Sequence, residues 1–251
     1  MLTLITVNDI IYHSMLKIEN ARVFGIADAL RAMRNPLNSW NKNDSVIKID
    51  PETGSAVSVN LGPNDLSLCK RLAAGGQPHR KYLRQISVSL DITAPSYWWA
   101  EMDTYKVATT RNSCSLQHKG DSRNFIMSDF TINPLDQITA DDLDSGMNIE
   151  AAKDLVTIMN IVNKWRNRYV DGNKSNYGLF RVMRQLLPMG YNYKATWNGN
   201  YESLMNIHFW RQHHKLIEWR VFCSEIETLP MMNILLNKET VCSKNEATDS
   251  K

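Results

Sequence analysis

Three short polar stretches have the residue types that bind an anionic, phosphate-bearing ligand. The first, residues 184–188, reads Arg-Gln-Leu-Leu-Pro, with an arginine just before a helix-ending proline. A guanidinium binds phosphate through two parallel hydrogen bonds, and its position one turn before the proline predicts that Arg184 lies beside the core. The alternative is a surface cation that complements the negative end of the helix dipole.

The second stretch runs from Asn200 to Arg211. Asn200 is a natural helix N-cap, and Leu204 and Ile207 follow at helical spacing. Asn206 and Arg211 are five residues apart, about 140° around a helix. Their side chains therefore diverge, and one ligand can contact both only at the edge of the helix between them. The alternative is a cap followed by two solvated polar residues.

The third stretch, residues 109–115, reads Thr-Thr-Arg-Asn-Ser-Cys-Ser. Its hydroxyl and amide groups follow an aromatic segment, and such a run can hold a phosphate with side-chain and backbone donors. The alternative is a polar turn with local side-chain-to-backbone hydrogen bonds.

Other residue patterns exclude several classes of function. The four cysteines form no Cys-x-x-Cys pair, and His213 and His214 face different directions on a helix with no acidic partner in register, so no metal site is predicted. Scattered thiols, the lack of a secretory signal at the N-terminus and the lack of a long apolar run predict a cytoplasmic protein with no membrane partner. A net charge of +3 from 29 basic and 26 acidic residues is too balanced to indicate a nucleic-acid polymer as partner.

Helices and strands alternate along the chain, which predicts an α/β or α+β fold with helices concentrated in the second half. The predicted helices are residues 18–33, 66–74, 96–105, 149–168, 176–187, 200–213 and 216–228, and the predicted strands are 45–49, 55–60, 84–92 and 191–196. Residues 45–60 read as a hairpin, residues 93–96 as a break, and residues 106–148 as mostly loop. A further alternative is a helical interaction protein whose aromatic residues simply form its core, and most of five tryptophans are expected in the core in any case: Trp98, Trp99, Trp165, Trp210 and Trp219. We predict one domain over residues 1–236 and a polar, frayed tail over 237–251.

Together the three stretches resemble the flavin-dependent thymidylate synthase family (ThyX). That family carries an Ala-Arg-x-x-Leu-Pro element, to which residues 183–188 correspond with methionine in place of alanine. It also carries an Asn-x-Arg-x-Leu helix followed by a second asparagine and an arginine, to which residues 200–204, Asn206 and Arg211 correspond. Upstream, residues 66–92 look like the family's helix, glycine turn, histidine and strand. The resemblance covers most of residues 60–225.

The family signature, Arg-His-Arg-x-x-Ser-x-Asn-x-x-Ser-x-Arg-Tyr, corresponds to residues 105–118. Asn112 and Ser115 match it, and Thr110 keeps a hydroxyl where the family has serine. The Arg-His-Arg triplet is replaced by Tyr-Lys-Val at residues 105–107, and the closing Arg-Tyr is Gln-His. Lys106 is the cation left within the triplet, and Arg111 and Lys119 are candidates to substitute from nearby.

The resemblance implies a ThyX-like fold, an antiparallel or mixed sheet flanked by helices. It also implies an enzyme that transfers a one-carbon unit from methylenetetrahydrofolate to the uracil ring of dUMP, with FAD as cofactor, NADPH as reductant and a homotetrameric assembly. The alternative is a catalytically altered or inactive nucleotide-binding member of the fold, for example a deoxyuridylate-modifying enzyme with a different product, which the lost triplet favours.

The resemblance also implies roles for individual residues. The catalytic residue is Arg211, which reads and polarises the uracil ring. The substrate is bound by Arg184, Arg211, Ser115 and Lys106, and the flavin by His79, Asn112, Asn200 and Asn206.

Overall fold

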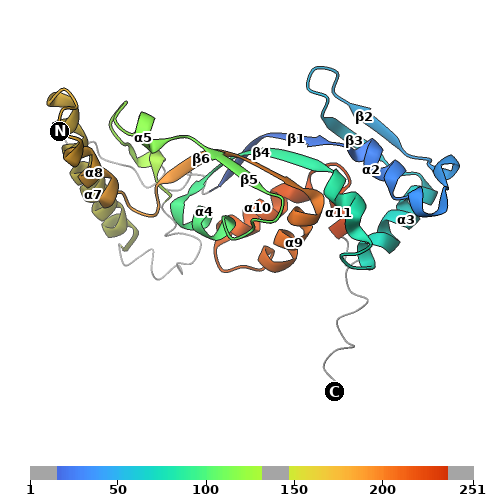
Figure 1. The fold of residues 1–251 in the computed structure, drawn as a ribbon. Helices are drawn as coiled ribbons and strands as arrows, with labels where there is room; N and C mark the ends of the chain where they lie inside the picture. Colours follow the sequence, from blue (N-terminus) through green and yellow to red (C-terminus); the bar gives the residue numbers. More distant parts are fainter. Residues whose placement is uncertain (1–15, 132–146, 237–251) are drawn as a thin grey trace. The chain divides into compact units, whose positions relative to one another are not determined.

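The computed structural model describes residues 16–131 and 147–236, in which helices flank an antiparallel sheet (Figure 1). The strands are β1 Lys17–Phe24, β2 Val46–Ile49, β3 Ala56–Asn60, β4 Ser87–Pro95, β5 Thr110–Ser113 and β6 Asn192–Asn200. The helices are α2 Ile26–Ala32, α3 Pro63–Ala74, α4 Ser96–Met102, α5 Leu116–Lys119, α7 Met147–Asp171, α8 Tyr177–Leu186, α9 Tyr201–Arg211, α10 Ile217–Glu227 and α11 Met232–Leu236. Short 3₁₀ turns are η1 Asn35–Leu37, η2 Trp40–Lys42, η3 Arg80–Gln85 and η4 Met127–Asp129. The predicted fold class is confirmed.

Four strands form one sheet in the order β1-β4-β6-β5, and β2 pairs with β3 in a separate hairpin. The predicted hairpin is confirmed, with Ile47 opposite Val59. Both predicted sheet strands exist: β4 has the predicted length but is shifted three residues along the chain, and β6 is longer than expected. The break expected at residues 93–96 is wrong, because β4 continues to Pro95 with Ile92 and Ala94 still buried on alternate positions.

The helix predicted over residues 18–33 is wrong in its first half, where the chain forms β1. Only Ile26–Ala32 is helical, and Gly25 separates the two elements with a positive φ of 80°. A side chain at Gly25 would place its Cβ 2.5 Å from the backbone oxygen of Gln85, so only glycine is accommodated at this crossing. Periodicity alone does not distinguish a short strand followed by a short helix from one longer helix.

The described residues group into two compact units. One contains residues 18–91, 105–111 and 196 onward, and the other contains residues 92–104 and 112–195. The chain passes between them repeatedly, within β4 and within β6 among other places. The prediction of a single domain over residues 1–236 stays a prediction, and the predicted tail lies outside the described residues.

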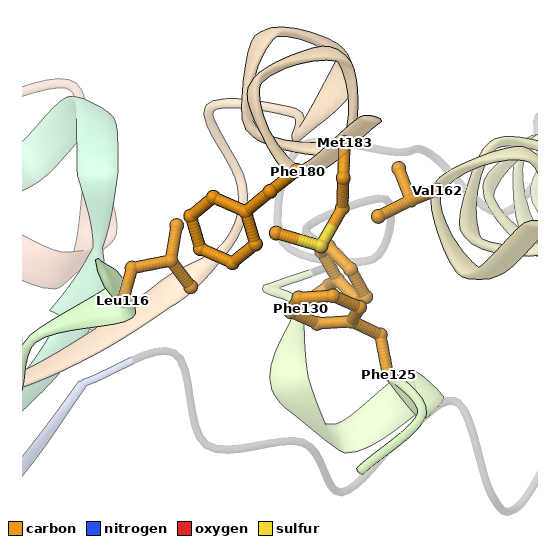
Figure 2. Close-up of a cluster of buried hydrophobic side chains, with 6 residues drawn as sticks. All are labelled: Leu116, Phe125, Phe130, Val162, Phe180 and Met183. Carbon is orange, nitrogen blue, oxygen red and sulfur yellow. The ribbon is translucent and has the colours of Figure 1, made fainter. Parts of the chain in front are cut away.

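The second of these units has a core built where α7 and α8 pack together. Figure 2 shows Met183 of α8 pointing toward Phe125 and Phe130, with Phe180 of α8 pointing toward Leu116 and Val162 of α7 beside Met183. Both helices agree with the predictions over residues 149–168 and 176–187, the first of which rests on apolar periodicity. Even α7, at 25 residues, is not apolar enough to span a membrane, and the same holds for every helix in the described part of the chain.

Of the five tryptophans, Trp98, Trp99 and Trp219 are buried and Trp165 is partly buried, as expected for most of them, whereas Trp210 is exposed. It is 71% exposed on α9, where the residues facing the core are Leu204 and Ile207. Trp210 lies two positions after the buried His208, about 200° around the helix, which turns its side chain away from the buried face.

Candidate functional site

Helix α9 begins where the sequence predicts. The side-chain oxygen of Asn200 accepts a hydrogen bond from the backbone N–H of Ser203 at 3.0 Å, and Asn200 is only 7% exposed. This is an N-cap in a β-region conformation, and it satisfies one of the N–H groups left over at a helix start. The cap is therefore confirmed. Asn206 lies half-buried in the middle of the same helix.

At the other end of α9, Arg211 lies half-buried among aromatic rings. Its Nε donates to the hydroxyl of Tyr105 at 2.8 Å, and its Cζ lies 4.6 Å from the centre of the Trp219 ring. The ring of Tyr105 is also within reach of the guanidinium, at 5.6 Å. Phenol and indole carry no formal negative charge, so these contacts orient the cation by hydrogen bonding and cation–π attraction without forming an ion pair. We call Tyr105, Arg211, His214 and Trp219 the arginine cluster.

His214 closes this cluster. Its Nε2 lies 2.9 Å from Nη1 of Arg211, and its Nδ1 lies 3.2 Å from the backbone nitrogen of Leu216. A guanidinium can only donate, so Nε2 accepts from Nη1 of Arg211, while the backbone N–H of Leu216 points at Nδ1. Holding Arg211 at Nε and Nη1 together fixes both the plane and the rotation of its guanidinium.

His79 forms part of the wall of a cavity of about 330 Å³. The other walls include Met33 and Pro36 after α2, Leu72 of α3, and Tyr82 of η3. The Tyr82 hydroxyl donates to the backbone oxygen of Cys69, and burial raises the pKa of Tyr82, so this phenol stays neutral. The space suits a ring system rather than a whole dinucleotide.

The glycine turn beside this cavity allows His79 to pack closely against Gly75. A Cβ at Gly75 would lie 2.9 Å from Cδ2 of His79, so the absence of a side chain lets the imidazole pack against the end of α3. Arg84 then ties the turn to α9, because it forms an ion pair with Glu202 in the first turn of that helix and donates to the backbone oxygen of Gln77 at 3.3 Å. The wall containing His79 and the start of α9 are thus braced together.

The signature segment and Arg184 meet in the other unit. Ser115 is the residue before α5, and two positions later Gln117 accepts a hydrogen bond from Nη1 of Arg184 at 3.0 Å. The amide nitrogen of Gln117 in turn donates to the hydroxyl of Tyr177 at 2.7 Å. Asn112 is exposed on β5. The structure therefore brings Arg184 to the end of the signature segment.

The prediction that Arg184 lies beside the core is wrong, because its side chain is exposed. The buried face of α8 presents Phe180 and Met183, and the next residue along is turned about 100° away from Met183. Its exposure agrees with the alternative of a surface cation near the helix C-terminus.

The predicted site residues divide between the two units. His79, Lys106, Asn200, Asn206 and Arg211 belong to one unit, and Asn112, Ser115 and Arg184 to the other. Lys106 is exposed in the loop after α4. Asn200 and Arg211 are at opposite ends of α9, about 16 Å apart along its axis, so they cannot contact the same small group. No three histidine, cysteine, aspartate or glutamate side chains gather as a metal site within residues 16–131 and 147–236.

Two residues that contact the predicted arginines were not predicted as site residues. Tyr105 and Gln117 occupy the first and thirteenth positions of the signature, where the sequence departs from the family. Comparison with a family motif identifies the matching positions and leaves the substituted positions unassigned. The alignment of Tyr105 and Gln117 with the motif is nevertheless a usable signal, because a residue that replaces a binding residue occupies the same position in the fold.

Comparisons with known proteins place the fold. No family model matches the sequence, and no curated protein matches it. A crystal structure of the flavin-dependent thymidylate synthase ThyX from Helicobacter pylori, complexed with FAD and dUMP, is similar with a TM-score of 0.59 and 15% identity over 91% of this chain and all of that one. The UMP/dUMP methylase PolB from Streptomyces cacaoi, bound with 5-Br dUMP, is similar with a TM-score of 0.57 and 13% identity over 86% of this chain and 90% of that one. The chain therefore has the fold of the flavin-dependent thymidylate synthases.

Proposed function

We propose that the chain is a flavin-dependent enzyme that transfers a one-carbon unit from methylenetetrahydrofolate to the fifth ring carbon of dUMP, with NADPH as the reductant. The observation that carries this proposal is the likeness of fold along the whole length of a protein solved with FAD and dUMP. The arginine cluster and the contact of Arg184 with the signature segment add chemistry that suits a pyrimidine nucleotide.

Arg211 supplies the charge that the uracil ring needs. The fifth ring carbon becomes nucleophilic when electron density moves into the ring, and a cation at a ring carbonyl stabilises the enolate-like charge that develops. Tyr105 and His214 hold the guanidinium in one orientation, so little reorganisation is required during the reaction. We assign Arg211 as the catalytic residue of the protein.

Arg184, Ser115 and Lys106 are assigned to the nucleotide phosphate. Arg184 and Lys106 are exposed cations, and Ser115 provides a hydroxyl near the Gln117 that orients Arg184. An arginine fork recognises phosphate with two parallel hydrogen bonds, while a lysine acts as a point charge.

The described residues fit a flavin. The apolar wall of the cavity, with Met33, Leu72 and Tyr82, suits a flat ring, and the imidazole of His79 can donate or accept at its edge. The side-chain oxygen of Asn200 is used in capping α9, so its amide nitrogen is the group assigned to the cofactor. Asn112 and Asn206 complete the assigned set. When bound, the flavin supplies the hydride, and the protein contributes orientation and charge.

A second candidate is a nucleotide-binding member of the fold with a different product or no turnover. Tyr105 and Val107 stand in place of two arginines, and Val107 is 86% exposed, so two guanidinium forks are absent from this loop. The methylase from Streptomyces cacaoi has the same fold.

Two measurements separate these candidates. The first is the absorbance spectrum of the purified protein before and after incubation with FAD, which should show bound flavin. The second is dUMP-dependent release of tritium from the fifth ring carbon, in the presence of methylenetetrahydrofolate and NADPH. Flavin binding with tritium release and dTMP as the product supports the synthase, whereas tritium release with another product supports the second candidate. Binding of dUMP without flavin or release supports the second candidate, and binding of neither ligand contradicts both.

Replacing Arg211 tests its assigned role. Arg211→Ala should reduce tritium release about 100- to 1,000-fold, because a preorganised charge at the reacting ring is lost. Arg220→Ala is the matched control, since Arg220 is an exposed arginine on the neighbouring helix α10. Unfolding curves of both variants should stay cooperative. Unchanged release in Arg211→Ala would remove the catalytic role of Arg211.

A further inference from the structure

The loop over residues 105–109 is fastened at several points within its unit. The hydroxyl of Thr109 donates to the backbone oxygen of Tyr105, which closes the loop on itself. The hydroxyl of Ser203, in the first turn of α9, lies 3.2 Å from the backbone oxygen of Val107. At the far end of α9, Nε of Arg211 donates to the Tyr105 hydroxyl at 2.8 Å. The phenol is therefore held by a backbone that is itself anchored.

The aromatic ring of Tyr105 is also held in place by a neighbouring aromatic ring. It packs edge-on against Trp219, with ring centres 6.0 Å apart and planes at 67°. Trp219 is fully buried, so it provides a rigid support. Because both the hydroxyl and the ring of Tyr105 are positioned, the hydrogen bond to Arg211 has a defined direction, and it selects one rotamer of a long, flexible side chain.

We propose that Tyr105 is a positioning residue that orients the Arg211 guanidinium for the pyrimidine ring of the nucleotide. This inference rests on the proposed function. Tyr105 acts through Arg211: its hydroxyl occupies Nε, and together with His214 at Nη1 it sets the plane in which the guanidinium meets a ring carbonyl. Ordering Arg211 before the ligand arrives reduces the conformational entropy lost on binding.

The test is a double-mutant cycle measured by calorimetric binding of dUMP. Tyr105→Phe removes only the hydroxyl and should raise the Kd for dUMP about tenfold, the size expected for a hydrogen bond to a charged group. Tyr201→Phe is the matched control: it also loses a single tyrosine hydroxyl bond, the 2.7 Å donation to the backbone oxygen of Pro230, and should leave the Kd unchanged.

The decisive arm is the Arg211→Lys background, in which there is no Nε–H to orient. There, Tyr105→Phe should change the Kd less than about twofold, because the two substitutions remove the same interaction. A structural effect of Tyr105 would instead appear equally in both backgrounds, and that result would overturn the proposal. All Kd values are compared at a temperature where circular dichroism shows each variant folded.

The remaining outcomes distinguish this inference from the proposed function. If the unaltered protein binds dUMP and Tyr105→Phe binds it equally well, the positioning role fails while the proposed function stands. If the unaltered protein does not bind dUMP, the proposed function fails and the positioning role fails with it.

Discussion

The two arginines assigned to the nucleotide have different surroundings, and this decides how each can act. Arg211 is half-buried and held at two nitrogens, whereas Arg184 is exposed and contacts the amide of Gln117. A preorganised, partly desolvated cation can stabilise developing charge. The charge of an exposed cation is screened by water and salt, so such a cation contributes mainly by attracting a phosphate and fixing its position.

This difference gives a prediction for Gln117→Glu, which keeps the shape of the side chain and places a carboxylate beside Arg184. The new ion pair should weaken dUMP binding about two- to fivefold at low salt, because an exposed pair contributes about 0.2–1 kcal/mol. Binding of deoxyuridine, which has no phosphate, should not change. Gln185→Glu adds the same charge at an exposed neighbouring position on α8 and serves as the control. Equal weakening for both ligands would contradict the assignment of Arg184 to the phosphate.

Among the elements, α9 connects most of the residues assigned in its unit. Its cap is Asn200, its middle contains Asn206 and its end is Arg211. The ion pair between Arg84 and Glu202 joins its first turn to the wall that contains His79. The backbone of α9 therefore sets the positions of these assigned residues.

Asn200 has two assigned functions, and two substitutions separate them. Asn200→Ala should lower the free energy of unfolding by about 1 kcal/mol, the usual cost of a lost N-cap. Asn200→Asp keeps a capping oxygen and should unfold like the unaltered protein, but it lacks the amide N–H assigned to the flavin. We therefore expect weaker flavin binding from Asn200→Asp in a fluorescence titration. Unchanged flavin affinity with normal stability would leave Asn200 with the capping role alone.

The walls of the cavity beside His79 depend on a buried ion pair. Asp65 of α3 accepts from Nε of Arg34 at 2.8 Å and from the hydroxyl of Ser45 at 2.7 Å, and neither charged side chain is more than 4% exposed. Asp65→Ala should lower the free energy of unfolding by about 3–5 kcal/mol, because it leaves the charge of Arg34 buried and uncompensated. Chemical denaturation measures this loss.

Replacing both members of the pair is the matched experiment. Arg34→Met with Asp65→Leu removes both buried charges and should recover part of the stability lost in Asp65→Ala. Recovery stays partial, because Asp65 also accepts the backbone N–H groups of Asp44 and Ser45. A double variant no more stable than Asp65→Ala would show that the ion pair is not the source of the loss.

At the scale of the whole molecule, the two compact units are interleaved along the chain. Both β4 and β6 begin in one unit and end in the other. A strand whose hydrogen bonds are shared in this way does not unfold in halves without exposing unpaired backbone groups. We therefore expect one cooperative unfolding transition for residues 1–236.

Calorimetry and circular dichroism test this expectation together. The calorimetric and van't Hoff enthalpies should agree, and near- and far-ultraviolet signals should change at the same temperature. Two separated transitions would contradict the single-domain prediction. Light scattering on the same sample measures the oligomeric state, for which we propose a homotetramer.

The amino-acid sequence predicts the features that depend on neighbouring residues. The cap at Asn200 and the β2–β3 turn follow from side chains that bond to backbone groups two or three positions away. The amphipathic pattern of α7 follows from a periodicity contained in the helix itself. The family resemblance in the C-terminal half and the fold class were predictable for the same reason, since both rest on local order and spacing.

Which distant residues come into contact depends on tertiary packing. Tyr105 and Arg211 are 106 positions apart, and Gln117 and Arg184 are 67 apart. Register in the signature marks Tyr105 and Gln117 as positions of interest, but the sequence does not show their partners, because each contact depends on how the helices pack on their buried faces. The β1 strand was missed for a related reason: its backbone hydrogen bonds are supplied by β4, far along the chain. The sequence identifies the arginines, and the packing around them determines that Arg211 is rigid and Arg184 is solvated.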